Sequence, residues 1–350
     1  MFDEIFLLIL AAVIAFLFSW AFRTLPREDW QILACLPGRK GPGGIWSGVN
    51  LTYYGFFNAL AYVFAVVMFL IMIGSLGVTL GAALSVILPL LAVCMWASRF
   101  IARLVEKKPH TFSVGAASFV GIVVAPWIIV LVNATLGKLF MFHIPFTETL
   151  AAMVIAYAIG EGIGRLACIS FGCCYGKPLA ECNPILQRIF RRSNFVFWGK
   201  TKKITYADEL EGLAVIPIQA LTAVIYTGTG LISLYFFLKG QAAAALMLGI
   251  AVTQVWRFVS EFLRADHRGQ GHISAYQIMT LAGMGYALVF ALVKTDPFRV
   301  RPDLGQGLLF LWHPGLILFL AGLWIAAFLF TGRSSVTCSS IDIRIVEKNI

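Results

Sequence analysis

Long apolar runs separated by short polar connectors dominate the pattern of this chain. Five uncharged stretches each provide the roughly 20 residues with which a helix crosses about 30 Å of hydrocarbon. They are residues 51–74, 77–98, 112–137, 213–238 and 273–293. Four further candidates, of which the middle two contain charges, are residues 5–22, 149–167, 241–262 and 308–330. Membrane-spanning β-strands are much shorter and alternate polar with apolar residues. The pattern therefore predicts an all-α, polytopic integral membrane helical bundle with about eight or nine transmembrane helices.

The composition supports a single membrane domain over residues 1–350. Apolar residues make up 60% of the chain and charged residues only 13%, and the mean hydropathy of +0.86 lies far above that of a soluble domain. The one long polar connector inside the predicted bundle, residues 172–212, indicates a small extramembrane cap. Its basic and aromatic run RIFRRSNFVFWGKTKK fits either an ordinary solvated loop or an interfacial segment that contacts acidic lipid headgroups.

The net charge of +10 does not indicate nucleic-acid binding, because the basic residues lie in connectors beside the spans. There they meet anionic headgroups or set the topology. With nine spans, connectors on the side of the C-terminal tail hold 20 Lys and Arg residues, and those on the opposite side hold five. By the positive-inside rule, the side with 20 would be cytoplasmic and the N-terminus external.

Charged residues inside the predicted spans indicate a functional site, because an ionisable group at membrane depth is costly and usually faces a cavity, a partner or a substrate. Glu161 and Arg165 are four residues apart and share one helix face. The segment QVWRFVSEFLRADHRG places a polar stripe on a second helix. The stripe consists of Gln254, Arg257, Glu261 and Arg264.

The two helices together offer three arginines and two carboxylates, which leaves one positive charge in excess. Because the planar guanidinium suits a phosphate, an anionic lipid headgroup is the partner that this excess favours. The competing interpretation is that these residues are structural ion pairs between helices, or mark the interfacial ends of the spans.

The stretch GRLACISFGCCYGKP, residues 164–178, resembles the signature G-R-x-G-N-F-x-N-G-E-x-x-G-R-P of the phosphatidylglycerol–prolipoprotein diacylglyceryl transferase family. Four further blocks resemble family motifs in the same order: TYYGFF, IPIQAL, WRFVSEFLRAD and SAYQIMTL. Together they define a diacylglyceryl-transferase-like core over residues 51–293. The positions that match the motifs are Tyr54, Gly164, Arg165, Gly172, Gly176, Pro178, Pro217, Gln219, Arg257, Glu261, Arg264 and Gln277, with Lys177 in place of an arginine.

The chain also departs from the family pattern at several polar positions. Cys168 and Phe171 replace asparagines, Cys173 replaces a glutamate, and Ala167 replaces a glycine. The family's histidine ahead of the signature has Ser113 or Val114 in its place, with His110 displaced. The family's arginines at Arg165 and Arg257 and its glutamate at Glu261 are retained, which supports binding of a lipid headgroup. The replaced polar residues affect the expectation of which acceptor receives the lipid group.

The resemblance implies a transferase of the bacterial cytoplasmic membrane that acts in lipoprotein biosynthesis. A prolipoprotein cysteine thiol would attack the terminal glycerol carbon of phosphatidylglycerol or a related anionic phospholipid, and glycerol 1-phosphate would leave. Such a displacement needs cations on the phosphate and a base near the thiol, and it needs no metal or cofactor. Family membership would also place the signature on the outer side of the membrane, opposite to the positive-inside prediction.

The family's roles carry over to matching positions. Arg165 and Arg257 would stabilise the phosphate, and Glu261 or Glu161 would orient the arginines or accept the proton. The residues implied in substrate binding are Tyr54, Gly172, Gly176, Lys177, Gln219, Arg264 and Gln277.

Cys168, Cys173 and Cys174 allow two interpretations. They could form a nucleophile or metal site near positive charge, or they could be small packing residues in a tight glycine-rich turn. We favour packing, because the sequence has no C-x-x-C spacing there and free cysteine often behaves as a small hydrophobe.

Two other function classes remain alternatives. One is a related phospholipid-modifying transferase with a different acceptor. The other is a non-catalytic lipid-binding or transport protein, in which the charged stripe would line a pathway. Transporters are often built from inverted repeats or broken helix pairs, and the sequence shows neither.

Overall fold

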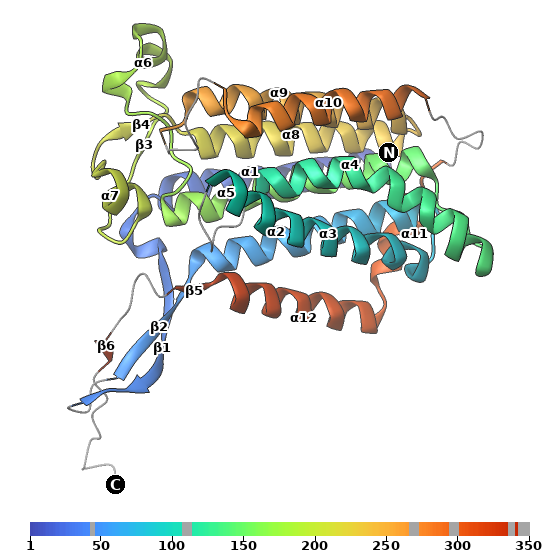
Figure 1. Cartoon of the computed structure of the whole chain (residues 1–350), viewed down its shortest axis with the longest axis horizontal. Coiled ribbons are helices and arrows are strands. Elements are labelled where there is room, and N and C mark those ends of the chain that lie inside the picture. The colour runs from blue at the N-terminus through green and yellow to red at the C-terminus, as the bar shows by residue number, and fades with distance from the viewer. Residues whose placement is uncertain (43–45, 107–113, 266–272, 294–300, 335–339, 342–350) are drawn as a thin grey trace.

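The computed structural model describes residues 1–42, 46–106, 114–265, 273–293, 301–334 and 340–341. In this part of the chain eight helices are long and apolar enough to cross a membrane, which confirms the predicted all-α polytopic bundle (Figure 1). These are α1 (Phe2–Thr24), α2 (Tyr53–Ser75), α3 (Leu80–Glu106), α4 (Val114–Val132), α5 (Phe146–Phe171), α8 (Ile218–Leu238), α9 (Ala242–Leu263) and α12 (Pro314–Thr331). Helix α10 (Ala275–Val293) packs against α9 and α4 and is shorter in its apolar part.

Helix α5 is the centre of the bundle. It packs against α2, α8 and α9, and it is the most buried of the eight apolar helices in the described chain. Two glycines permit this close packing. A Cβ on Gly160 would lie 2.7 Å from Ala65 of α2, and one on Gly162 would lie 2.9 Å from the Ala223 carbonyl oxygen of α8. Small residues at such crossings let helix backbones approach, which is how membrane helices gain dispersion contacts. The same helix carries Glu161 and Arg165, so its charges lie inside the protein.

A cap of short elements follows α5 at one end of the bundle (Figure 1). It contains a 3₁₀ turn (Leu179–Glu181), α6 (Pro184–Phe190), β3 (Phe195–Val196), α7 (Lys203–Asp208) and β4 (Ala214–Val215). The fully buried Lys202 fixes the cap to the spans, because its Nζ donates to the carbonyl oxygens of Leu25 at 3.2 Å and Ser170 at 2.6 Å. Burial lowers the pKa of this lysine to about 8.

The segment between the first two predicted spans contains an antiparallel hairpin of β1 (Ile32–Lys40) and β2 (Trp46–Thr52), which the apolar pattern does not predict. Strands β5 (Arg333–Ser334) and β6 (Ser340–Ile341), which follow the last span, also pair with β2. The predicted span at 308–330 is not one helix. It divides into α11 (Leu304–Leu311) and α12, and the break lies at Trp312 and His313 because Pro314 has no N–H with which to continue the first helix.

The cap, the hairpin and strand β5 share one end of the bundle, while the N-terminus lies at the other (Figure 1). The Trp198 amide donates to the Pro26 carbonyl oxygen at 3.1 Å, and the Gln31 side chain bonds to Thr201. Two of the basic connectors, the cap and the segment that contains the hairpin, therefore lie together on one side.

Candidate active site

Glu161 and Arg165 form an ion pair one helical turn apart on α5. Their side chains are only 11% and 13% exposed, so the pair is sheltered from water and weakly screened. A third residue, Tyr157, lies one turn before Glu161 on the same face. Helix α5 therefore presents a column of polar groups inside an apolar bundle.

The guanidinium of Arg165 has bonding capacity left over. Its Nη2 pairs with Glu161, and its Nη1 lies 4.0 Å from the Cys168 sulfur. Its Nε is buried and has no hydrogen-bond partner among the described residues. An unsatisfied buried N–H on a cation is costly, and an anionic oxygen is the group that would satisfy it.

The polar stripe on α9 faces this pair. Arg257 is buried, and its Nη1 donates to the Tyr157 hydroxyl at 3.4 Å. Its other terminal nitrogen fills space at Gly115 on α4, where an added Cβ would lie 2.4 Å from Nη2. Glu261, one turn further along α9, is close enough to interact electrostatically with the Arg257 guanidinium. Arg257 is therefore held between α4, α5 and α9.

These side chains enclose one polar cavity of about 20 Å³. The cavity has room for about one water molecule. Its lining residues come from α5, α8, α9 and the residue that directly follows α9. They are Arg165, Thr222, Tyr226, Trp256, Arg257, Ser260, Glu261 and Arg264. A larger hollow of about 520 Å³ between α2, α3 and α11 contains no charged residue. The structure thus brings together Arg165, Arg257, Glu261 and Arg264 in one pocket, as the sequence predicts.

The glycine-rich turn after α5 is joined by hydrogen bonds to the end of α9. Gly176 forms an antiparallel bridge with Arg264, and the Lys177 amide donates to the Leu263 carbonyl oxygen at 3.0 Å. A Cβ on Gly176 would lie 2.4 Å from the Ile216 carbonyl oxygen. The signature turn is therefore joined through its backbone to the last arginine of the stripe. The Lys177 side chain itself is exposed and does not line the pocket.

The two residues predicted to bind substrate from α8 and α2 lie beside this turn. Gln219 Nε2 donates to the Cys173 carbonyl oxygen at 2.9 Å, and its Oε1 is buried without a partner among the described residues. Tyr54 packs against Phe171, with ring centroids 5.5 Å apart. Neither residue lines the cavity itself.

Gln277 on α10 has its side-chain amide engaged elsewhere. Its Nε2 donates to the Phe258 carbonyl oxygen at 3.2 Å, and its Oε1 accepts from the Ser274 amide at 2.8 Å. It braces α10 against α9 one residue after Arg257. At the position of the family's histidine, Val114 begins α4, whereas His110 and Ser113 lie outside the described residues.

Sequence reasoning missed several site residues. Tyr157 could have been found from its i,i+4 spacing to Glu161, and Tyr226 lies seven residues after Gln219 on the same face of α8. The Trp256 Nε1 donates to the Thr222 hydroxyl at 3.0 Å, which closes the pocket wall. Gly115 carried no signal, because its role depends on where a guanidinium from another helix ends.

Comparison with known proteins gives the family. The sequence profile of prolipoprotein diacylglyceryl transferase matches residues 44–293. The phosphatidylglycerol–prolipoprotein diacylglyceryl transferase 2 of Clostridium perfringens (strain 13 / Type A) is 29% identical over 137 residues, which is 38% of this chain and 46% of that relative. The chain thus matches just under half the length of this relative. Because the profile covers more than half of the chain, including the three helices that line the pocket and the signature turn, the chain belongs to the prolipoprotein diacylglyceryl transferase family.

Proposed function

We propose that this protein transfers the diacylglyceryl group of phosphatidylglycerol to the cysteine thiol of a prolipoprotein in the bacterial cytoplasmic membrane. The observation that carries the proposal is the convergence of Arg165, Arg257 and Arg264 with a carboxylate in one pocket inside an apolar bundle. The Clostridium relative is named for the same lipid and the same class of acceptor.

The charge balance of the site fits a phosphodiester headgroup. Three arginines and the carboxylates of Glu161 and Glu261 leave one net positive charge, and a phosphatidylglycerol phosphodiester carries one negative charge. As the glycerol carbon–oxygen bond breaks, negative charge builds up on the leaving phosphate. Guanidinium groups already fixed in a water-poor site stabilise that charge without reorganising. The unpartnered Nε of Arg165 would donate to a phosphate oxygen.

The proposed reaction is a displacement at carbon. The thiolate sulfur forms a bond to the terminal glycerol carbon of the diacylglyceryl group, and the bond from that carbon to the phosphate oxygen breaks. The electron pair leaves with glycerol 1-phosphate, and the thiol proton passes to a carboxylate. We assign the base to Glu261, which lines the pocket, and the positioning of Arg165 to Glu161, which is engaged in the ion pair.

The pocket must widen to admit the headgroup, since 20 Å³ holds about one water. We propose that Trp256 is the part of the pocket wall that moves, because it is half-buried and its side chain donates one hydrogen bond, to the Thr222 hydroxyl. Its rotation would open the space between α8 and α9 toward the lipid.

The test uses purified full-length protein in detergent with phosphatidylglycerol labelled in its headgroup glycerol and a peptide with one cysteine in a lipoprotein-type sequence. We expect release of labelled glycerol phosphate that depends on the peptide and is absent with a Cys→Ser peptide. Release of the headgroup that continues unchanged without any thiol would refute the proposed cysteine acceptor. No release from folded protein would refute the proposed transferase activity.

A further inference from the structure

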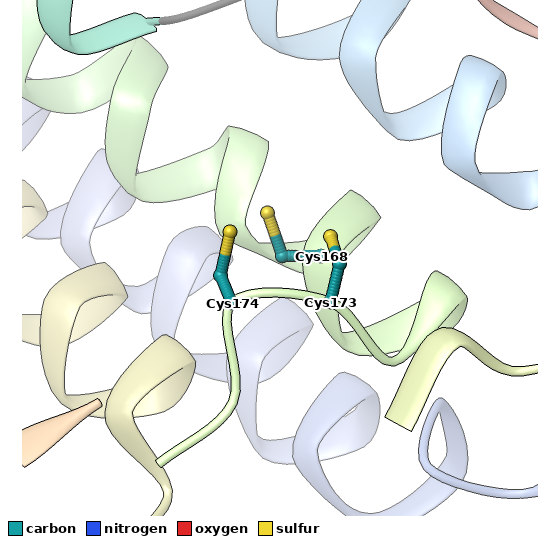
Figure 2. A group of neighbouring side chains, drawn as sticks. All are labelled: Cys168, Cys173 and Cys174. Atoms are coloured by element: carbon teal, nitrogen blue, oxygen red, sulfur yellow. The ribbon is translucent and has the colours of Figure 1, made fainter. Parts of the chain in front are cut away.

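Three cysteine sulfurs meet beside the pocket. Cys168 lies on the last turn of α5, and Cys173 and Cys174 lie in the turn that follows; the Sγ atoms are all within 4.8 Å of one another. Figure 2 shows the three sulfur atoms on the same side of the turn. None of the three forms a disulfide bond, and Cys173 is buried while the other two are half-buried.

The backbone accounts for this convergence. Gly172 ends α5 in the left-handed conformation, with φ 68°, so the chain reverses. The Cys173 amide then donates back to the Cys168 carbonyl oxygen at 3.0 Å. Cys174 is itself left-handed, with φ 58°, which is rare for a residue other than glycine. The turn is held from outside by Gln219, whose Nε2 donates to the Cys173 carbonyl oxygen at 2.9 Å.

We propose that Cys168, Cys173 and Cys174 form a three-thiolate site for a thiophilic d¹⁰ metal ion such as Zn²⁺. A metal–sulfur distance of about 2.3 Å in a tetrahedral site places the sulfurs about 3.8 Å apart. The sulfurs lie within 4.8 Å of one another, so side-chain rotations that shift each sulfur by about 1 Å would bring them to the distances of a metal site. The described cluster contains sulfur ligands alone, and thiolates favour Zn²⁺ or Cu⁺ over hard cations.

The charge around the cluster supports this assignment. Three thiolates and one Zn²⁺ carry a net charge of −1, and Arg165 Nη1 lies 4.0 Å from the Cys168 sulfur. The guanidinium, which also pairs with Glu161, would stabilise the negative charge of the occupied site in a low-dielectric setting, where an isolated charge is expensive. Packing alone would require three small side chains, but it gives no reason for three sulfurs to lie together on one side of a strained turn.

The first test is metal titration of the purified full-length protein in detergent, under a non-thiol reductant, and it needs no lipid substrate. We expect Cd²⁺ to produce a saturable thiolate-to-metal absorption at one ion per chain, and Zn²⁺ added first and in excess to weaken the apparent binding of Cd²⁺ by competition. Binding should release protons as thiols ionise. Cys94→Ser and Cys182→Ser, which alter free cysteines outside the cluster, should leave the titration unchanged. Cys168→Ser or Cys173→Ser should weaken binding by about 100-fold or more, the upper range for loss of even an outer contact of a metal site.

A second measurement uses the unmodified chain, so it does not depend on how variants fold. Zn²⁺ should protect Cys168, Cys173 and Cys174 from maleimide labelling, read by peptide mass spectrometry, while Cys94 and Cys182 label as before. A titration with no saturable absorption would overturn the proposal. The same would follow if Cys94→Ser lost as much metal affinity as Cys168→Ser, or if Zn²⁺ left the labelling of the three cysteines unchanged. A Cys168–Cys173 disulfide in protein purified without reductant, together with no metal binding after reduction, would also overturn it and would identify a redox pair.

Discussion

Replacing Gly176 by alanine tests how the signature turn positions the site. The added Cβ would lie 2.4 Å from the Ile216 carbonyl oxygen, about 1 Å inside the 3.4 Å at which ordinary contact begins. The obstacle is backbone and not a flexible side chain, and the Ile216 amide is itself bonded to the Lys177 carbonyl oxygen at 3.0 Å. The turn must therefore move by about 1 Å, and the bridge from Gly176 to Arg264 transmits that movement to the pocket.

A misplacement of about 1 Å can lower a rate by about 100-fold even when it originates outside the reacting groups. We expect Gly176→Ala to reduce release of glycerol phosphate by about that factor, measured with labelled phosphatidylglycerol and the cysteine peptide. The protein should still accumulate in the membrane, because the clash lies outside the helix crossings of the core. Gly228→Ala on α8 is the matched control, since a Cβ there meets no atom within 4 Å. Equal activity of the two variants would refute the coupling between turn and pocket.

Three further predictions follow from other parts of the structure. Glu261→Gln should lower kcat by about 100-fold, as expected for loss of a general base, with little change in membrane yield; a loss of yield at normal activity per molecule would assign Glu261 to structure. Lys202 has its pKa lowered from 10.5 to about 8 by burial, so between those pH values the unfolded chain binds more protons and stability rises with pH. Lys202→Met should remove that rise in melting temperature, and parallel pH curves for the two proteins would contradict this. An impermeant maleimide should label Lys200→Cys and Arg333→Cys from one side of the membrane and Lys138→Cys from the other. Labelling of the first two from opposite sides would contradict the fold. The side from which Lys200→Cys is labelled decides between the positive-inside rule and the family resemblance.

The sequence predicts the parts of the molecule that depend on local periodicity. Apolar runs identify the spans because each helix satisfies its own backbone hydrogen bonds in lipid. The pairing of Glu161 with Arg165 and the stripe from Arg257 to Arg264 follow from helical spacing alone. The sequence offers the charges of these two helices as a phosphate site, and in the structure Arg165, Arg257, Glu261 and Arg264 line one cavity.

The parts that the sequence does not predict depend on contacts between distant segments. Gly115 matters because the Arg257 guanidinium ends there. The grouping of the cysteine sulfurs depends on two left-handed residues, and Cys174 gives no sign in the sequence that it adopts that conformation. The hairpin of β1 and β2 escaped prediction because its apolar residues lie between the first two spans and read as part of a connector. Packing seemed the better interpretation of the cysteines from their spacing, and the distances between their sulfurs are the reason to propose a metal site instead.

The most direct test of the phosphate clamp is the rate of glycerol phosphate release by Arg165→Lys compared with Arg188→Lys. Lysine keeps the charge and can still face Glu161, but it lacks the planar fork that holds a phosphate through two parallel hydrogen bonds. Arg188 is exposed on α6 in the cap and serves as the matched control. We predict that Arg165→Lys loses at least about 100-fold, the cost of removing one fixed donor from a developing negative charge, and that Arg188→Lys keeps the wild-type rate. A wild-type rate for folded Arg165→Lys would contradict the account.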